Sequence, residues 1–227
     1  MWYNKLNLEM KKIRKSGQIV VVTILVVIGA LLSVTPAAAE STSSHEYQVK
    51  AAFMFQFVNF IDGWKFQQKD SESNKNNSDK DKLVLVGIIG ENPFKDAFVP
   101  LMEKKIRDRR IVLKQFKGFS DYKKKDKKIE VHPDIEDIKK CDMLFICSSE
   151  RQYIIDVLKP VQSERILTVA DTQDFIEHGG IINFIIEKNK VRFEVNVIAA
   201  KRANLIFRSK LLRLAARVIM EDKVEGK

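Results

Sequence analysis

Apolar runs that predict buried strands alternate along the chain with polar segments that carry helix-capping residues. Leu83–Ile89 is a continuous apolar run, rich in β-branched residues, which is typical of a strand buried on both faces of a sheet. Asn92-Pro93 follows it, and an asparagine before a proline predicts the start of a helix. The pattern recurs in predicted strands at Ile111–Phe116, Met143–Cys147 and Ile166–Ala170, and in predicted helices at Asp134–Lys139, Arg151–Leu158 and Thr172–His178.

Strands that alternate with helices over short connections predict an α/β fold, with a mostly parallel sheet and helices on both of its faces. The C-terminal part differs, because Ile181–Ile186 and Val191–Val195 flank a polar tetrapeptide and predict an antiparallel hairpin at the C-terminal edge of the sheet. Two further helices are expected, one over Val197–Ala203 with Asn196 as its cap, and a last one from Lys210 to about Met220.

The segment before the first strand contains an expected helix and an expected loop. His45–Gly63 places apolar residues on most sides of a helix, which predicts a buried helix. Gln67–Lys82 has no apolar side chain and is expected to be a mobile polar loop. Because no internal repeat is visible, residues 40–227 are predicted to form a single domain.

Residues 1–39 have the organisation of a secretory signal peptide. Basic residues precede the apolar run Ile19–Leu32, and Ala37-Ala38-Ala39 offers a small-residue cleavage site. A membrane anchor is the alternative, but a span needs about 20 apolar residues. The sequence therefore favours export with cleavage after Ala39, and translation can start at Met1 or Met10.

Composition and charge narrow the class of protein. With 45% hydrophobic and 31% charged residues, the chain is neither collagen-like, low-complexity nor wholly disordered. The formal charge is +10 for the whole chain and +6 for residues 40–227. Such an excess favours acidic partners or a membrane surface. An exported protein without a nucleic-acid motif is not expected to bind nucleic acid.

The sequence contains no recognised catalytic, metal or cofactor motif. Ser148-Ser149 lacks the glycines of a nucleophile elbow, and the three histidines have no metal-ligand spacing. Gly87 and Gly90 follow a strand but belong to neither a dinucleotide-binding nor a phosphate-binding loop. The prediction is a protein that is not an enzyme, with no metal and no cofactor.

Polar residues at the expected strand ends are candidates for a small-molecule site. Ligands of open α/β sheets bind beyond the carboxyl ends of the strands. Helix N-termini at these ends would favour an anionic ligand. Helix capping explains the same residues, which are Asn92, Ser149, Asp171 and Thr172.

Cys141 and Cys147 are disulfide candidates, because an exported protein meets an oxidising compartment. If both belonged to one strand, six steps of about 3.3 Å would place their Cα atoms near 20 Å apart, beyond the roughly 7 Å limit for a bridge. An internal disulfide therefore requires a break in the strand. Two buried core thiols, or one thiol free for an intermolecular bond, are the alternatives.

Several motifs carry a joint resemblance to a known family. They are Tyr47-x-Val49-Lys50-Ala51-Ala52-Phe53, Gly90-x-Asn92-Pro93-Phe94, Cys141-Asp142-x-Leu144-Phe145-Ile146, Leu167-Thr168-Val169-x-Asp171, Val191-Arg192-Phe193-Glu194-Val195-Asn196 and Ser209-Lys210-Leu211-Leu212-x-Leu214-Ala215. Together they resemble the YfiR family of periplasmic proteins over nearly all of residues 40–227.

This resemblance implies a non-enzymatic repressor that binds the periplasmic domain of a membrane diguanylate cyclase, or of a sensor kinase, and so controls cyclic di-GMP signalling and biofilm formation. It also implies a homodimer and redox control through disulfides. Cys141 matches a family cysteine, but Phe175–Ile186 contains no cysteine, so disulfide control near that segment does not carry over. A periplasmic module that binds an anionic small molecule is the alternative function.

The resemblance directs attention to the last predicted strand and the residues that follow it. Glu194, Asn196, Arg202 and Arg208 are the candidate partner-binding residues, because a charged residue is unusual in an apolar strand. A structural salt bridge of Glu194 with Arg202 or Arg208 is the alternative. On the last expected helix, Lys210, Arg213 and Arg217 would share one face, either solvated or partner-binding.

Overall fold

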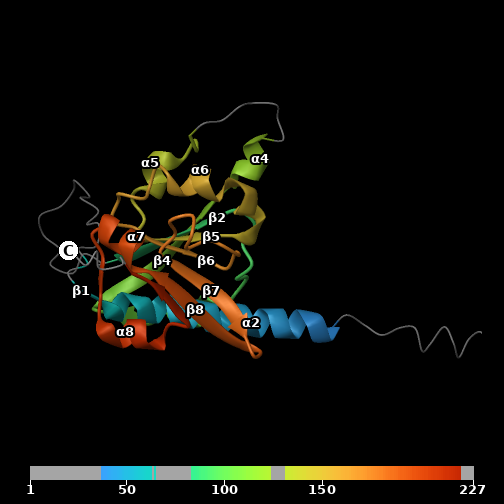
Figure 1. Ribbon diagram of the computed structural model, residues 1–227. Coiled ribbons are helices and arrows are strands. Elements are labelled where there is room, and N and C mark those ends of the chain that lie inside the picture. The colour runs from blue at the N-terminus through green and yellow to red at the C-terminus, as the bar shows by residue number, and fades with distance from the viewer. Residues whose placement is uncertain (1–36, 63, 65–82, 124–130, 221–227) are drawn as a thin grey trace, which may run out of the picture. The chain divides into compact units, whose positions relative to one another are not determined.

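The computed structural model describes residues 37–62, 64, 83–123 and 131–220. The chain divides into two units, residues 1–43 and residues 44–227. Within these described ranges, the larger unit contains an eight-stranded sheet of order β10-β8-β7-β6-β5-β2-β4-β3 (Figure 1). A separate antiparallel pair joins β1, Ile61–Asp62, to β9, Ile206–Phe207.

The middle of the sheet is parallel, as the sequence predicts. Strand β2 pairs in parallel with β4 and β5, and β6 pairs in parallel with β5 and β7. Every residue of β5 and β6 is buried, which explains why these strands are, apart from Thr168, apolar without alternation. The bounds are β2 Leu83–Ile89, β4 Arg109–Phe116, β5 Met143–Ile146, β6 Leu167–Ala170 and β7 Ile182–Glu187.

The predicted hairpin is confirmed, and a short parallel strand extends the sheet beyond it. Strand β7 pairs antiparallel with β8, Lys190–Asn196, and β8 pairs in parallel with β10, Arg217–Ile219. At the opposite edge, β3, Lys105–Ile106, pairs antiparallel with β4. The α/β fold class is therefore confirmed.

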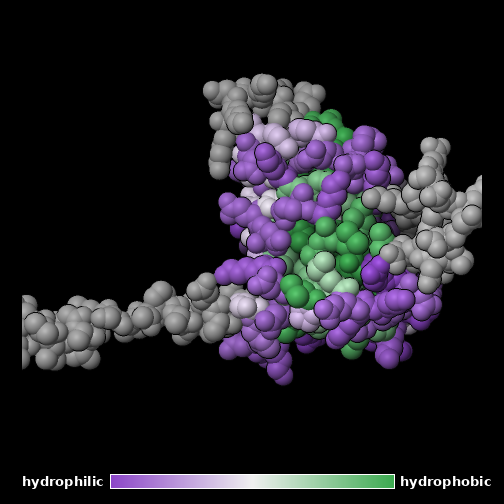
Figure 2. Space-filling view, turned by 180° about the vertical axis from the view of Figure 1, so that it is seen from behind, coloured by the Kyte–Doolittle hydropathy of each residue, from purple (hydrophilic) through white to green (hydrophobic). Residues whose placement is uncertain are grey.

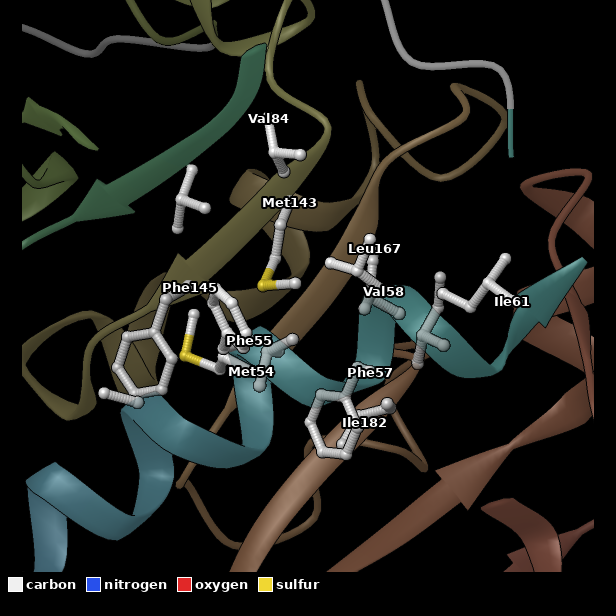
Figure 3. Close-up of a cluster of buried hydrophobic side chains, with 14 of the residues drawn as sticks. Met54, Phe55, Phe57, Val58, Ile61, Val84, Met143, Phe145, Leu167 and Ile182 are labelled. Carbon is white, nitrogen blue, oxygen red and sulfur yellow. The ribbon is translucent and has the colours of Figure 1, made fainter. Parts of the chain in front are cut away.

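Helices cover both faces of the sheet and produce two hydrophobic clusters. Figure 1 shows α2 and α8 on one side and α4, α5 and α6 on the other. The α2-side cluster contains Met54, Phe57, Phe145 and Leu167 (Figure 3), and the α6-side cluster contains Phe119, Ile146, Leu158 and Phe175. The helices are α2 Ala37–Phe57, α3 Val99–Met102, α4 Phe119–Lys123, α5 Ile135–Ile138, α6 Ile154–Leu158, α7 Val197–Arg202 and α8 Ser209–Leu214, with 3-10 turns at Val58–Phe60 and Ser148–Tyr153.

Aromatic rings fasten α2 to the hairpin strands. Phe57 stacks on Phe184 of β7 at a centroid distance of 5.8 Å and meets Phe193 of β8 edge-on at 5.2 Å. Phe53, one turn earlier, meets Phe193 edge-on at 5.7 Å. The expected helix was therefore correctly placed in the core, although α2 ends at Phe57 and β1 follows the next three residues.

The last expected helix is wrong beyond Leu214. Ala215 has an extended backbone (φ −66°, ψ 143°), and the Ala216 amide donates to the Phe193 carbonyl at 2.8 Å. Val218 then pairs with Val195 of β8. Val218 and Ile219 are thus strand residues rather than part of the last expected helix, and Arg217 does not share a helix face with Lys210 and Arg213.

Two other expected helices are turns. After β2, the Asn92 side chain accepts a hydrogen bond from the Phe94 amide, and Lys95 has φ +47°, so no helix begins until α3. The segment Thr172–His178 also forms turns, because Asp174 has φ +62° and interrupts helical geometry. The helix capped by Asn196 is confirmed, since Asn196 Oδ1 accepts from the Ala199 amide at 2.8 Å.

Two expectations lie outside the described residues: the apolar run of the signal peptide and the polar loop at residues 67–82. Both stay predictions. In the part of the chain that the structure describes, no helix has the length and apolar character needed to cross a bilayer.

Replacing Phe57 tests the aromatic contact between α2 and the hairpin. Because Phe57 is 1% exposed and contacts two rings, Phe57→Ala is expected to lower the free energy of unfolding by about 3–5 kcal/mol, measured by urea denaturation. Ile206→Ala is the control, since Ile206 is 66% exposed, and its effect is expected to stay within about 0.5 kcal/mol. Equal losses of unfolding free energy in the two variants would contradict a role for the Phe57 ring in joining α2 to the hairpin.

Candidate functional site

A buried ion network lies where α2 meets the end of β6. The side chain of Lys50 is 4% exposed, and its Nζ lies 2.7 Å from Asp171 Oδ2 and 2.5 Å from Glu46 Oε1. The Tyr47 hydroxyl donates to the same Asp171 oxygen at 2.8 Å. Helical spacing of four residues aligns Glu46 with Lys50, and Asp171 directly follows β6. The network thus joins the first helix to the carboxyl end of a central strand.

Tyr47 is held in its neutral, donating form. Burial, followed by the nearby Asp171 carboxylate, raises the pKa of the Tyr47 hydroxyl well above its usual range. The Lys50 ammonium also lies 4.2 Å from the centre of the Tyr47 ring, a cation–π distance. The ring therefore shields the ammonium while the hydroxyl shares its carboxylate.

A pocket of about 490 Å³ lies beside this network. Its walls come from α2, from the segment after β6, and from the strands β7, β8 and β10. The lining residues are Glu46, Tyr47, Lys50, Ser148, Asp171, Gln173, Asp174, Asn183, Phe184, Ile185, Ile186, Glu194 and Arg217.

A second ion network forms the wall at β8 and β10. Arg217 Nε donates to Glu194 Oε1 at 2.7 Å, and its Nη2 lies 2.5 Å from Glu177 Oε1. The strand register explains the first contact, because Arg217 is the Cα partner of Glu194. Glu194 thus makes a structural salt bridge, the alternative to a partner contact, but with Arg217 rather than with Arg202 or Arg208, because the missed strand β10 lies beside β8.

The candidate ligand residues lie at one edge of the sheet, since β2, β5 and β6 are neighbouring parallel strands. Ser149 Oγ accepts from the Glu91 amide at 3.0 Å, and the Thr172 amide donates to Asn183 Oδ1 at 3.1 Å. Asn92 holds the turn described above. Of the four candidates, Asp171 alone lines the pocket.

The candidate partner residues do not form one cluster. Glu194 lines the pocket, whereas Asn196 is buried and donates to the Ile176 carbonyl at 2.7 Å while it caps α7. Arg202 contacts Gln162 at 3.3 Å. Arg208 pairs with Asp62 of β1 at 2.6 Å, and its side chain is 53% exposed.

Tyr47 and Lys50 were not predicted to belong to a site, although both stand in the first of the motifs that resemble the family. A lysine in a helix that is apolar on most sides is the signal that could have identified them. Such a lysine cannot remain in the core without a carboxylate partner. The position of that partner, 121 residues away in the sequence, depends on the fold.

Both cysteines are buried and neither forms a disulfide. Cys147 belongs to the α2-side cluster, as do Met143 and Phe145 of β5. A bend at Asp142 interrupts the extended chain and turns Cys141 into the α6-side cluster. The strand break is thus present, but it separates the thiols onto opposite faces of the sheet.

Hydrophobic residues gather in one area on the face seen from behind, with hydrophilic residues around it (Figure 2). At the β4 end of the sheet, exposed large hydrophobic residues belong to α3 and β4: Val99, Met102 and Val112. Exposed apolar areas are frequent sites of protein contact.

In the described ranges, no group of three or more His, Cys, Asp or Glu side chains is arranged to hold a metal ion.

Comparisons with known proteins agree with the family resemblance that the sequence motifs suggest. A family model described as YfiR/HmsC-like matches residues 47–216. No sequence among the curated proteins matches the chain.

Two solved structures show weak likeness. A conserved domain protein from Vibrio cholerae O1 biovar El Tor is 8% identical with a TM-score of 0.48, and the match covers 76% of this chain and 60% of that one. The ABC domain in complex with L-Trp from Streptococcus pneumoniae is 11% identical with a TM-score of 0.42, covering 60% and 55%. The chain thus spans less than two thirds of either structure's length.

Replacing Lys50 tests the buried network. Lys50→Met leaves the buried Asp171 carboxylate without its cation, so the free energy of unfolding is expected to fall by about 3–5 kcal/mol in urea denaturation. The matched control is Arg192→Met, which breaks the exposed pair with Glu187 and is expected to cost less than about 1 kcal/mol. Equal losses of stability in the two variants would contradict a stabilising role for the buried ion pair of Lys50 with Asp171.

Because both thiols are buried, the protein is expected to lose stability at alkaline pH. Burial raises the pKa of Cys141 to about 12 and raises the pKa of Cys147 further above its usual range. Unfolded thiols ionise near pH 8.5, so stability is full below that pH and decreases as the pH rises toward 12. By pH 10 the loss is expected to be about 2 kcal/mol for each thiol.

Urea denaturation between pH 8 and 10 measures this effect. The double variant Cys141→Ala/Cys147→Ala is expected to show a shallower decrease over that range, because it has no thiol to ionise. An identical pH dependence in both proteins would contradict the burial of the thiols. The range stops at pH 10 because Tyr47 contributes in the same direction above it.

Proposed function

Because the chain belongs to the YfiR/HmsC-like family, whose members are periplasmic regulators in cyclic di-GMP signalling, we propose that it binds the periplasmic domain of a membrane diguanylate cyclase and holds the enzyme inactive. A sensor kinase with a periplasmic domain is the alternative receptor. Release would raise cyclic di-GMP and favour biofilm formation. The observation that carries the proposal is the family match, which covers residues 47–216.

The state of the ionisable groups supports a binding role rather than catalysis. Lys50 and Arg217 are each engaged by two carboxylates, and Tyr47 stays protonated. Neither thiol is available as a nucleophile, because burial raises the pKa of both. The network stabilises the helix against the sheet and leaves the surface around it for contacts.

The surface offers exposed charged and apolar groups for a protein interface. The Arg208–Asp62 pair is about half exposed on both sides, so its charges are accessible to a partner. Val99 and Met102 add apolar area at the β4 end of the sheet. We assign the partner contact to these surfaces, with the protein acting in the periplasm as a homodimer after cleavage at Ala39.

Deleting the gene tests the repressor function. Cyclic di-GMP measured by mass spectrometry and biofilm mass are both expected to rise, and the full-length chain supplied from a plasmid is expected to restore them. Unchanged cyclic di-GMP in the deletion strain would refute the proposal. The tagged full-length chain is also expected to co-purify a membrane protein with a periplasmic domain.

Charge reversals locate the interface within the same assay. Arg208→Glu is expected to restore repression less than the unaltered chain does, because it reverses an exposed charge in the proposed interface. The matched control is Arg192→Glu, which also reverses an exposed, paired arginine. Equal repression by both variants would place the interface elsewhere.

A further inference from the structure

The charges around the pocket are unbalanced. Its lining contains the carboxylates of Glu46, Asp171, Asp174 and Glu194, and the cations of Lys50 and Arg217. An anion that entered would meet an excess of negative charge. A cation would meet the complementary field.

The two cations of the lining are already neutralised. Lys50 lies within 2.7 Å of both Glu46 and Asp171 oxygens, and Arg217 lies within 2.7 Å of both Glu194 and Glu177 oxygens. Neither offers a free positive charge to a ligand. By contrast, the Asp174 carboxylate makes no ion pair with any residue in the described ranges.

One oxygen of the Asp171 carboxylate lacks a hydrogen-bond donor in the described ranges. Its side chain is 7% exposed, and both of its donors, the Tyr47 hydroxyl and the Lys50 ammonium, bind Oδ2. Oδ1 is buried with no hydrogen-bond partner among the described residues. A buried carboxylate oxygen without a donor is rare, and it strengthens the attraction of the pocket for positive charge.

Part of the remaining wall is apolar, and the rest includes the polar side chains of Ser148, Gln173 and Asn183. Phe184, Ile185 and Ile186 come from β7, and Ile186 is 52% exposed. An apolar wall beside carboxylates suits a ligand with a hydrocarbon stem and a charged head, as in lysine and arginine side chains. The volume of about 490 Å³ also lies within the usual range of small-molecule sites.

We propose that this pocket binds an organic cation, an ammonium or guanidinium group on an apolar stem. This inference goes beyond the proposed function and does not rest on it. It also differs from the anionic ligand that the helix N-termini suggested. The cation has two sources: a lysine or arginine side chain of a protein partner, or a free small amine.

Calorimetric titration of the protein purified after export tests the proposal. n-Butylguanidinium chloride and n-butylammonium chloride are the probes, and n-butanol and sodium butyrate at equal ionic strength are the neutral and anionic controls. The cations are expected to bind and to raise the melting temperature, and the controls are not. Butyrate or butanol binding as tightly as the cations would overturn the proposal.

A single variant connects the binding to the pocket. Asp174→Asn removes the carboxylate that makes no ion pair with a described residue, and it is expected to weaken butylguanidinium binding about fivefold. Asp96→Asn is the matched control, because Asp96 is exposed and does not line the pocket, and its affinity is expected to be unchanged. Equal affinities for both variants would overturn the assignment to this pocket.

Two further ligands separate the sources of the cation. The tripeptide acetyl-Gly-Arg-Gly-amide presents a guanidinium group as a protein does, whereas putrescine is a free amine. Tighter binding of the tripeptide supports a partner side chain, and tighter binding of putrescine supports a small amine. Binding of neither would overturn the proposal. Because no receptor is present, these results are independent of repression in cells.

Discussion

A buried ammonium group determines how the first helix meets the sheet. Lys50 loses nearly all of its contact with water, so its charge must face carboxylates, and these lie on its own helix at Glu46 and at the end of β6 at Asp171. A rotation of α2 by one residue would leave the ammonium among apolar groups. The rings of Phe53 and Phe57 follow on later turns of the helix and contact the hairpin strands in this orientation.

The same constraint shapes the surface beside it. Lys50 and Arg217 each form ion pairs with two carboxylates of the same chain. The pocket between them therefore has an excess of negative charge. Stability and recognition therefore arise from one arrangement. The ion pairs hold α2, β8 and β10 in place, and the remaining carboxylate, Asp174, makes no ion pair with a residue in the described ranges.

This arrangement explains what several polar residues of the family motifs do in the structure. Tyr47 and Lys50 in the first motif meet Asp171 in a later one through hydrogen bonds at 2.8 and 2.7 Å. Asn196 serves as a helix cap, and Glu194 accepts a hydrogen bond from Arg217 of the neighbouring strand β10. Most of these matched polar residues maintain the framework, which fits a protein whose proposed role is to present a surface to a receptor.

Local pattern determined much of the fold, and long-range contacts decided the rest. The continuous apolar runs located β2, β5 and β6, because strands buried on both faces need no alternation. The α/β class and the hairpin followed from spacing alone. Helix and strand could not be told apart for Val218, because its apolar neighbours suit both periods and pairing with Val195 decided between them. Asp171 was identified at its strand end, but its partners Tyr47 and Lys50 lie more than 120 residues away, so only the tertiary structure could bring them together.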